Sequence, residues 1–297
     1  MRPHRVMSTV QTVRSRMAWS DRQQQILRAM GLRVWAPSGA PASAEPEASA
    51  APEPKPAVWR EAQGKPQQEP THEPTQKHER PLIDNEHAQR IASLGWPALR
   101  EAVQACLACG LCQSRKQTVF GVGHPQAHWM VVGEAPGEQE DAQGEPFVGA
   151  AGQLLDNMLR ALSLTRASGD DNGPELPLAQ RAFIANALKC RPPRNRNPEP
   201  AELQSCEPFL ARQIALVQPR IILAMGRFAV QSLLRSSEPI GKLRGRVHLY
   251  RGVPLVVTYH PAYLLRNLPE KARAWEDLCL AASTVERASA ALQTPTS

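Results

Sequence analysis

The alternation of short apolar runs with longer amphipathic segments, from Glu86 onward, constrains this chain most. The short runs are typical of buried strands, and the longer segments repeat apolar residues at helical spacing. We expect strands at Trp129–Val132, Phe183–Ala185, Ile221–Ala224 and Val253–Thr258, and helices at Gly152–Leu164, Pro200–Val217 and from about Glu270. This order predicts an α/β fold with an open, mostly parallel central sheet flanked by helices.

Three polar residues each follow one of these strands. They are Glu134, Asn186 and His260. Open α/β sheets bind ligands beyond the carboxyl ends of their strands. We therefore expect the three side chains to converge on one pocket.

The residues before Glu86 differ in composition. Ala36 to Arg80 contains nine prolines and no sustained apolar period, which predicts a disordered linker over 36–85. Ahead of it, Ser20-Asp21 is a plausible N-cap for a short amphipathic peptide within 1–35. The folded domain is expected over 86–290, with a disordered tail at 291–297.

Charge is distributed unevenly along the chain, whose formal net charge is +7. Asn186 to His260 holds twelve Lys or Arg against four Glu, a net of +8, whereas Glu134 to Glu175 holds nine acids against two Arg, a net of −7. A basic half suits phosphate binding and an acidic half can supply carboxylates, although two differently solvated surfaces would look the same. No apolar run reaches the roughly 20 residues of a membrane span, so we expect a soluble protein of the cytoplasm. A monomer associated with the nucleoid is a separate expectation.

Four of the six cysteines form two distant pairs, Cys106 with Cys109 and Cys190 with Cys206. Such pairs suit a tetrahedral thiolate site better than disulfides, and spacing alone favours zinc over an iron–sulfur cluster. Cys112 completes a C-x2-C-x2-C run, but no fourth cysteine followed by proline comes close behind it, which disfavours a ferredoxin-like electron carrier.

Three ordered segments resemble the signatures of one enzyme family. Gly133–Asp141, followed by Gly144–Gly149 and Ala151–Leu155, resembles the first signature of the type 4 uracil-DNA glycosylases. Asn186–Pro198 resembles the second and His260–Arg266 the third. The resemblance implies a hydrolase of base-excision repair that flips uracil out of DNA and hydrolyses its N-glycosidic bond, leaving an abasic site.

The resemblance covers about Ala105 to Leu280 and assigns roles to individual residues. It places a [4Fe-4S] cluster on the four paired cysteines, in place of zinc. Phe147 would stack on the flipped base beside Ala135, and the amide of Asn186 would bond uracil N3–H and O4. His260 would donate to O2 as negative charge develops there.

Water activation is less defined by the resemblance. In the related type 1 enzymes an Asp occupies the place of Ala135, so Glu134 and Glu140 are the remaining catalytic candidates, along with backbone groups near Ala135. Either glutamate is equally interpretable as a helix-capping acid.

Contacts with DNA phosphates are expected from five arginines: Arg194, Arg196, Arg244, Arg246 and Arg266. A merely solvated basic face is the alternative. A uracil-DNA-binding protein of the same fold, with weak or trapped activity, is the alternative function; the intact Phe147, Asn186 and His260 argue against it.

The N-terminal peptide suggests a further partner. Arg28–Trp35 is similar to the start of the psi subunit of the bacterial clamp loader, where a short helix docks on the loader's collar. We therefore expect Asp21–Trp35 to bind a clamp loader or replicative polymerase component as a helix in a groove. A disordered leader with incidental apolar residues is the alternative.

Overall fold

A computed structural model of the chain describes residues 85–167 and 176–291, with side chains to residue 288. The predicted peptide at 1–35, nearly all of the linker at 36–85 and most of the tail at 291–297 lie outside the described residues. These assignments stay predictions.

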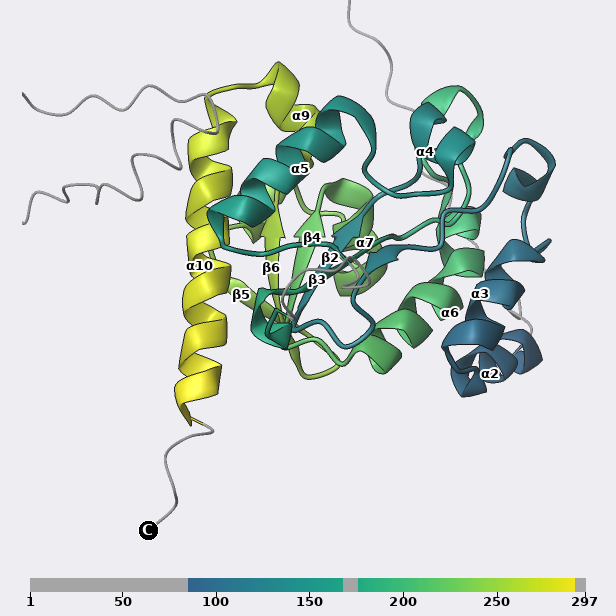
Figure 1. The fold of residues 1–297 in the computed structure, drawn as a ribbon. Coiled ribbons are helices and arrows are strands. Elements are labelled where there is room, and N and C mark those ends of the chain that lie inside the picture. Colours follow the sequence, from purple (N-terminus) through teal and green to yellow (C-terminus); the bar gives the residue numbers. More distant parts are fainter. Residues whose placement is uncertain (1–84, 168–175, 292–297) are drawn as a thin grey trace, which may run out of the picture. The chain divides into compact units, whose positions relative to one another are not determined.

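The described residues form one six-stranded sheet in the order β1-β3-β2-β4-β6-β5 (Figure 1). Its strands are β1 (Val122–Gly123), β2 (Trp129–Gly133), β3 (Ala182–Asn186), β4 (Ile221–Met225), β5 (Val247–Tyr250) and β6 (Val253–Thr258). The four central strands pair in parallel, whereas β1 and β5 are antiparallel at the two edges. The prediction of an open, mostly parallel α/β sheet is confirmed.

Helices flank this sheet. The α-helices are α2 (Asn85–Ser93), α3 (Trp96–Gln104), α4 (Glu138–Gln143), α5 (Gly149–Ala161), α6 (Pro200–Val217), α7 (Arg227–Leu234), α8 (Ile240–Leu243), α9 (Pro261–Arg266) and α10 (Glu270–Ala291). Short 3-10 turns lie at Gly110–Gln113, Leu178–Gln180 and Pro193–Asn195.

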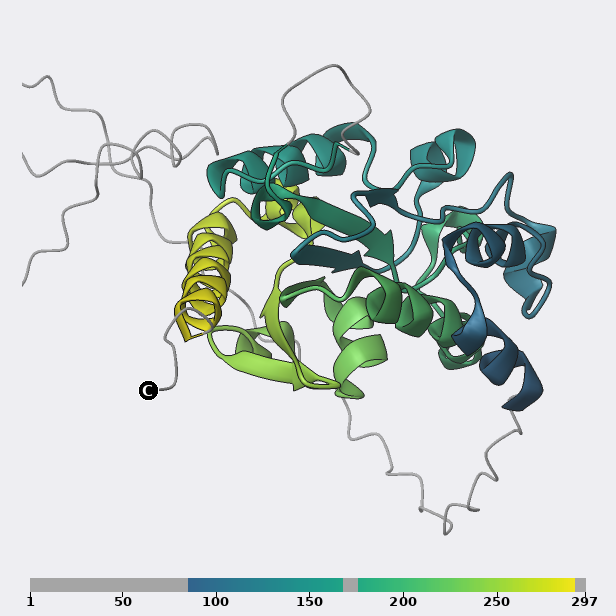
Figure 2. The same ribbon diagram turned by 60° about the horizontal axis from the view of Figure 1, so that its bottom comes forward.

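Alternation along the strands divides the core between two faces. Every second residue of the central strands, such as Val132 and Ala224, joins a buried cluster with the apolar stripe of α6 and with α7. Helix α10 packs against β6 and β4, and Figure 2 shows it at the side of the sheet, away from α6 and α7. An open cleft lies at the carboxyl ends of the parallel strands.

The ends of helix α6 agree with the sequence prediction, whereas those of helix α5 do not. Helix α6 has the predicted bounds, because Pro200 occupies its first turn and Glu199 with Glu202 forms a capping box. Helix α5 is shifted three residues toward the N-terminus and ends at Ala161. Ser163 adopts a left-handed conformation with φ 60°, which ends the helix before the predicted Leu164.

Candidate active site

The predicted polar residues lie at the carboxyl ends of three parallel strands, with β4 between β2 and β6. Glu134 follows β2, Asn186 is the last residue of β3, and His260 follows β6 and caps α9. The parallel register pairs Gly133 directly with Asn186. Glu134, Ala135 and His260 line one open cleft, which extends to Arg266, whereas Asn186 and Phe147 are not among the residues that line it. Strand pairing therefore gathers residues more than 120 positions apart.

Phe147 is held in an unusual backbone conformation beside this cleft. Its φ is 54°, in the left-handed region that costs a side-chain-bearing residue roughly 1–2 kcal/mol. Arg166 donates to the carbonyl oxygens of Pro146 and Phe147 at 3.0 and 3.1 Å, and pairs with Asp156 at 2.9 Å. The ring stacks on His260 with centroids 5.2 Å apart and planes at 24°. A fixed aromatic face is thus set against the imidazole.

Asn186 presents an unused acceptor beside Gly133 and Phe147. Its side chain is buried, and its Oδ1 atom has no hydrogen-bond partner. A buried acceptor left unpaired costs about 1–3 kcal/mol, so such an atom is typical of a site that awaits a ligand. A Cβ on Gly133 would lie 2.4 Å from Oδ1 of Asn186 and 2.5 Å from Cζ of Phe147. The amide and the ring therefore both depend on glycine at position 133.

His260 is fixed as a neutral donor. The backbone N–H of Ala262 donates to its Nδ1 at 3.2 Å, which leaves the ring proton on Nε2. Burial, with the nearby charge of Arg266, lowers the pKa of His260 from 6.5 to about 4. At neutral pH the imidazole can therefore donate a hydrogen bond from Nε2 without carrying charge.

The two candidate glutamates both accept hydrogen bonds at helix starts. Oε1 of Glu134 accepts from the backbone N–H of Phe228 in α7 at 3.1 Å, and burial raises the pKa of its carboxyl. Oε2 of Glu140 accepts from the backbone N–H of Gly137 at 3.1 Å, closing the cap of α4. Both side chains line the cleft, yet both also perform the capping role that is the alternative to catalysis.

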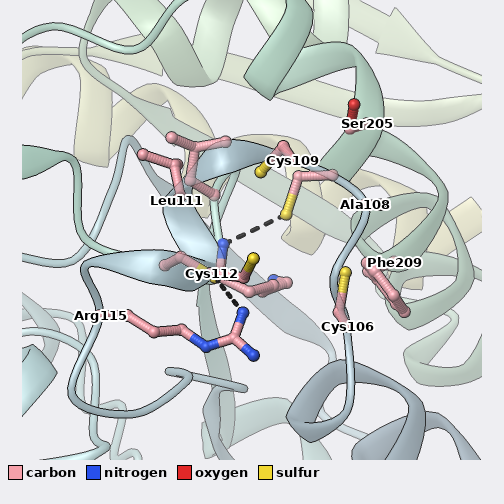
Figure 3. A pocket seen from close by; sticks show the side chains of 12 residues that line it. Cys106, Ala108, Cys109, Leu111, Cys112, Arg115, Ser205 and Phe209 are labelled. Carbon is pink, nitrogen blue, oxygen red and sulfur yellow. Dashed lines mark hydrogen bonds between the residues drawn. The ribbon is translucent and has the colours of Figure 1, made fainter.

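The four paired cysteines line one cavity beside the turn that follows β3 and the first turns of α6 (Figure 3). Cys106, Cys109, Cys190 and Cys206 line it, together with Cys112 and Arg115. Segments about 80 residues apart in sequence thus contribute thiols to one site. Burial raises the pKa of Cys206 to about 12, so a lone thiolate is disfavoured there without a cation to offset its charge.

Donors already point at these sulfurs. Nη1 of Arg115 donates to Sγ of Cys190 at 3.1 Å, and the backbone N–H of Lys189 donates to Sγ of Cys206 at 3.2 Å. Hydrogen bonds to ligand sulfurs are among the features that tune iron–sulfur clusters. The described residues contain no group of three or more His, Cys, Asp or Glu arranged to hold a metal ion. The four thiols nevertheless line one cavity, and four cysteine thiolates are the ligand set that an iron–sulfur cluster uses.

The five predicted DNA-contacting arginines separate into different settings. Arg266 and Arg196 line the cleft, whereas Arg194 and Arg246 are exposed outside its lining. Arg196 donates to both carboxylate oxygens of Glu202 at 2.9 and 2.6 Å, so part of its guanidinium is committed to α6.

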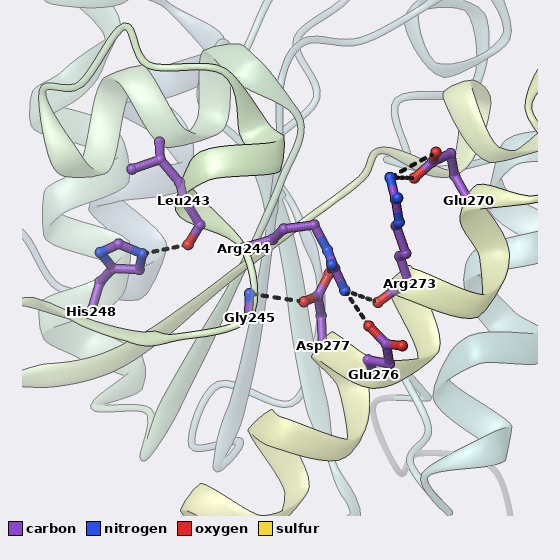
Figure 4. A network of polar contacts seen from close by, with 8 residues as sticks. All are labelled: Leu243, Arg244, Gly245, His248, Glu270, Arg273, Glu276 and Asp277. Carbon is purple, nitrogen blue, oxygen red and sulfur yellow. Dashed lines mark hydrogen bonds and ion pairs between the residues drawn. The ribbon is translucent and has the colours of Figure 1, made fainter.

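Arg244 belongs to a separate network with α10 (Figure 4). It pairs with Asp277 and Glu276, each at 3.0 Å, and Asp277 also accepts from the backbone N–H of Gly245. Asp277 is fully buried, and its pKa is raised by burial although Arg244 opposes the shift. The geometry therefore gives Arg244 a role in fastening this loop to α10, and its expected phosphate contact stays a prediction.

Several residues of the site were not singled out from the sequence. Arg166 lies outside the recognised signatures, and Gly133 and Lys189 lie inside them without an assigned role. Sequence spacing carries no signal for Arg166, because two of its partners are backbone carbonyls and a third, Asp156, lies ten residues away on α5. The steric demand at Gly133 depends on two side chains from other elements.

Comparisons with known proteins match most of the residues that the structure describes. Residues 120–279 match the model of the uracil DNA glycosylase superfamily. The chain is similar to proteins named type-4 uracil-DNA glycosylase from Sulfurisphaera tokodaii, Pyrobaculum aerophilum and Thermotoga maritima, with 41%, 39% and 37% identity. The alignments cover 57%, 61% and 63% of this chain and 75%, 90% and 93% of the relatives.

Proposed function

Since the chain belongs to the uracil-DNA glycosylase superfamily, we infer that it excises uracil from DNA by hydrolysing the bond between the base and deoxyribose. The observation that carries this inference is the unpartnered Oδ1 of Asn186 beside the Phe147–His260 stack. An acceptor, an aromatic face and a neutral donor are what a flipped uracil requires.

We propose a separate role for each of three residues in binding and releasing the base. Phe147 stacks on the flipped uracil, beside the backbone at Ala135. Oδ1 of Asn186 accepts from N3–H while its amide nitrogen donates to O4, a pattern that cytosine cannot satisfy. Nε2–H of His260 donates to O2 as the N1–C1′ bond breaks and the base takes the electron pair. One such donor is worth roughly 3 kcal/mol of transition-state stabilisation.

Glu134 is the better candidate for orienting the water that attacks C1′. Its raised pKa marks a carboxylate held in a desolvated place at the cleft. Glu140 is assigned to closing the cap of α4. Glu134→Gln separates catalysis from capping, because Gln keeps an oxygen acceptor for Phe228 N–H but loses the negative charge. We expect single-turnover excision to fall at least about tenfold with little change in melting temperature; an unchanged rate would leave Glu134 as a cap alone.

A [4Fe-4S] cluster is proposed at Cys106, Cys109, Cys190 and Cys206. Bound there, it would supply a structural cross-link between the segment before β1 and the Arg-rich loop that follows Cys190. Arg194 and Arg196 of this loop, together with Arg246 before β5 and Arg266 at the end of α9, are proposed to contact DNA phosphates.

The direct test uses an oligonucleotide with one uracil, followed by alkali cleavage at the abasic site. We expect cleavage at uracil and none in the matched thymine oligonucleotide. His260→Ala and Asn186→Ala are each expected to lower single-turnover excision at least about tenfold while DNA affinity changes little, because both act on the base. Unchanged excision by both variants would remove this active site.

We propose that Asp21–Trp35 binds a clamp loader or a replicative polymerase component. These residues lie outside those that the structure describes. We retain this interaction, with the monomeric state and nucleoid association, as a proposal. No helix in the described ranges 85–167 and 176–291 is long and apolar enough to cross a membrane. Recovery of clamp-loader subunits on a peptide of residues 1–40, but not on its Leu32→Ala plus Trp35→Ala form, is expected; equal recovery on both sinks the proposal.

A further inference from the structure

Lys189 is a buried cation for which the proposed reaction has no use. Its side chain is 2% exposed, on the turn between β3 and the Arg-rich loop. Nζ donates to the backbone oxygen of Asn186 at 2.8 Å and to Oε1 of Gln213 at 2.6 Å. Burying an ammonium group is costly unless it is well partnered, so these two bonds are needed to keep it there.

The partner amide from α6 is itself oriented. Nε2 of Gln213 donates to the backbone oxygen of Phe120 at 2.8 Å, which turns Oε1 toward Lys189. Gln213 is fully buried. The ammonium therefore lies in one defined position between α6 and the end of β3. Its hydrogen bond to the backbone oxygen of Asn186 fixes the main chain of that residue.

The same lysine touches the cysteine cavity. Its backbone N–H bonds Sγ of Cys206, and Cys190 is the next residue along the chain. Lys189 is itself among the residues that line the cavity. Four thiolates bring more negative charge than a cluster's irons and sulfides neutralise, so a buried cation at this point offsets the excess.

We propose that Lys189 is a positioning residue that joins the cysteine site to uracil recognition: it sets the main chain of Asn186 and offsets the charge of the cluster. The inference rests on the proposed function and on the proposed cluster. The side chain of Asn186 has no protein partner at Oδ1, so its aim depends on its main chain and on its contacts near Gly133. A shift of the cysteine loop would therefore move Lys189, and through its hydrogen bond also Asn186, which recognises the base.

The test compares Lys189→Met with Lys271→Met in the full, iron-loaded chain. Met keeps the length and apolar stem of lysine but removes the charge and the donors. Lys271 is a matched control, because it is also buried but lies on α10. For Lys189→Met we expect affinity for free uracil to fall at least about tenfold, as for loss of a hydrogen bond from a charged group, and iron release to a chelator to accelerate.

The decisive measurement is iron release with and without saturating uracil. Coupling between two sites is reciprocal in free energy, so uracil should favour the iron-loaded state of the wild-type protein. We expect uracil to slow iron release about fivefold in wild type and in Lys271→Met, and to have little effect in Lys189→Met. A purely structural lysine would leave this protection by uracil in place.

Each outcome is informative. Protection by uracil that survives in Lys189→Met, or is absent from a wild-type protein that excises uracil, overturns the inference alone. A wild-type protein that neither excises nor binds uracil overturns the proposed function instead. If Lys189→Met does not fold, Gln213→Leu carries the test, because it removes the oxygen that fixes the ammonium; wild-type uracil affinity and wild-type protection in that variant would also overturn the inference.

Discussion

A single added methyl group at Gly133 should disable the proposed site without unfolding the protein. In Gly133→Ala the new Cβ would lie 2.4 Å from Oδ1 of Asn186 and 2.5 Å from Cζ of Phe147. Both groups would have to move about 1 Å to reach ordinary contact distance, which is about 3.5 Å. A misplacement of about 1 Å in a catalytic arrangement costs roughly 100-fold in rate.

The assay is single-turnover excision from a uracil oligonucleotide, with thermal melting measured on the same samples. Overpacking a core typically costs about 1–3 kcal/mol, so we expect a lower melting temperature but a folded protein. Gly95→Ala is the matched control, because nothing lies within 4 Å of a Cβ at that position. Excision by Gly133→Ala within about threefold of wild type would refute the claim that Asn186 and Phe147 act from these positions.

Three further predictions concern single residues. Because burial lowers the pKa of His260 to about 4, the imidazole should stay neutral at pH 6.5. The loss of excision rate caused by its protonation should therefore appear only as pH falls toward 4. A rate profile with its midpoint at pH 6.5 that no other group accounts for would contradict a neutral imidazole. Cys190→Ser should lose bound iron, measured per chain by colorimetry, whereas Cys112→Ala should keep about four irons; stoichiometric zinc in anaerobically purified wild type would count against the cluster. Asn186→Asp should relax discrimination against cytosine, since a carboxylate can accept from its N4 amino group, and competition between uracil and cytosine oligonucleotides would show unchanged selectivity if Asn186 does not contact the base.

Much of the architecture was accessible from local pattern. The central parallel strands are continuous apolar runs because both of their faces are buried, and such runs stand out in a sequence. Helix α6 was placed at both ends because proline and a capping box mark its start. Glu134, Asn186 and His260 were placed at strand ends, and parallel strands bring such ends to one edge of a sheet.

The edge strands and the individual roles of the polar residues could not be obtained in this way. Strand β1 has two residues, and β5 exposes Val247 and Leu249, so neither carries the apolar run of a central strand. Arg244 and Arg266 look alike in sequence, yet one is tied to the buried Asp277 and the other lines the cleft. Such differences arise from partners far along the chain, and the distances between them are set when helices pack on the sheet.

Residue type and spacing thus carry the chemistry of this protein, namely the thiols, the amide, the aromatic ring and the imidazole. Their protonation, orientation and freedom depend on burial and on contacts that form only in the folded chain. His260 becomes a neutral donor because the backbone N–H of Ala262 in α9 donates to its Nδ1 and burial lowers its pKa. Lys189 was an ordinary basic residue in the sequence, and it becomes a buried link between two sites because α6 supplies Gln213 opposite it.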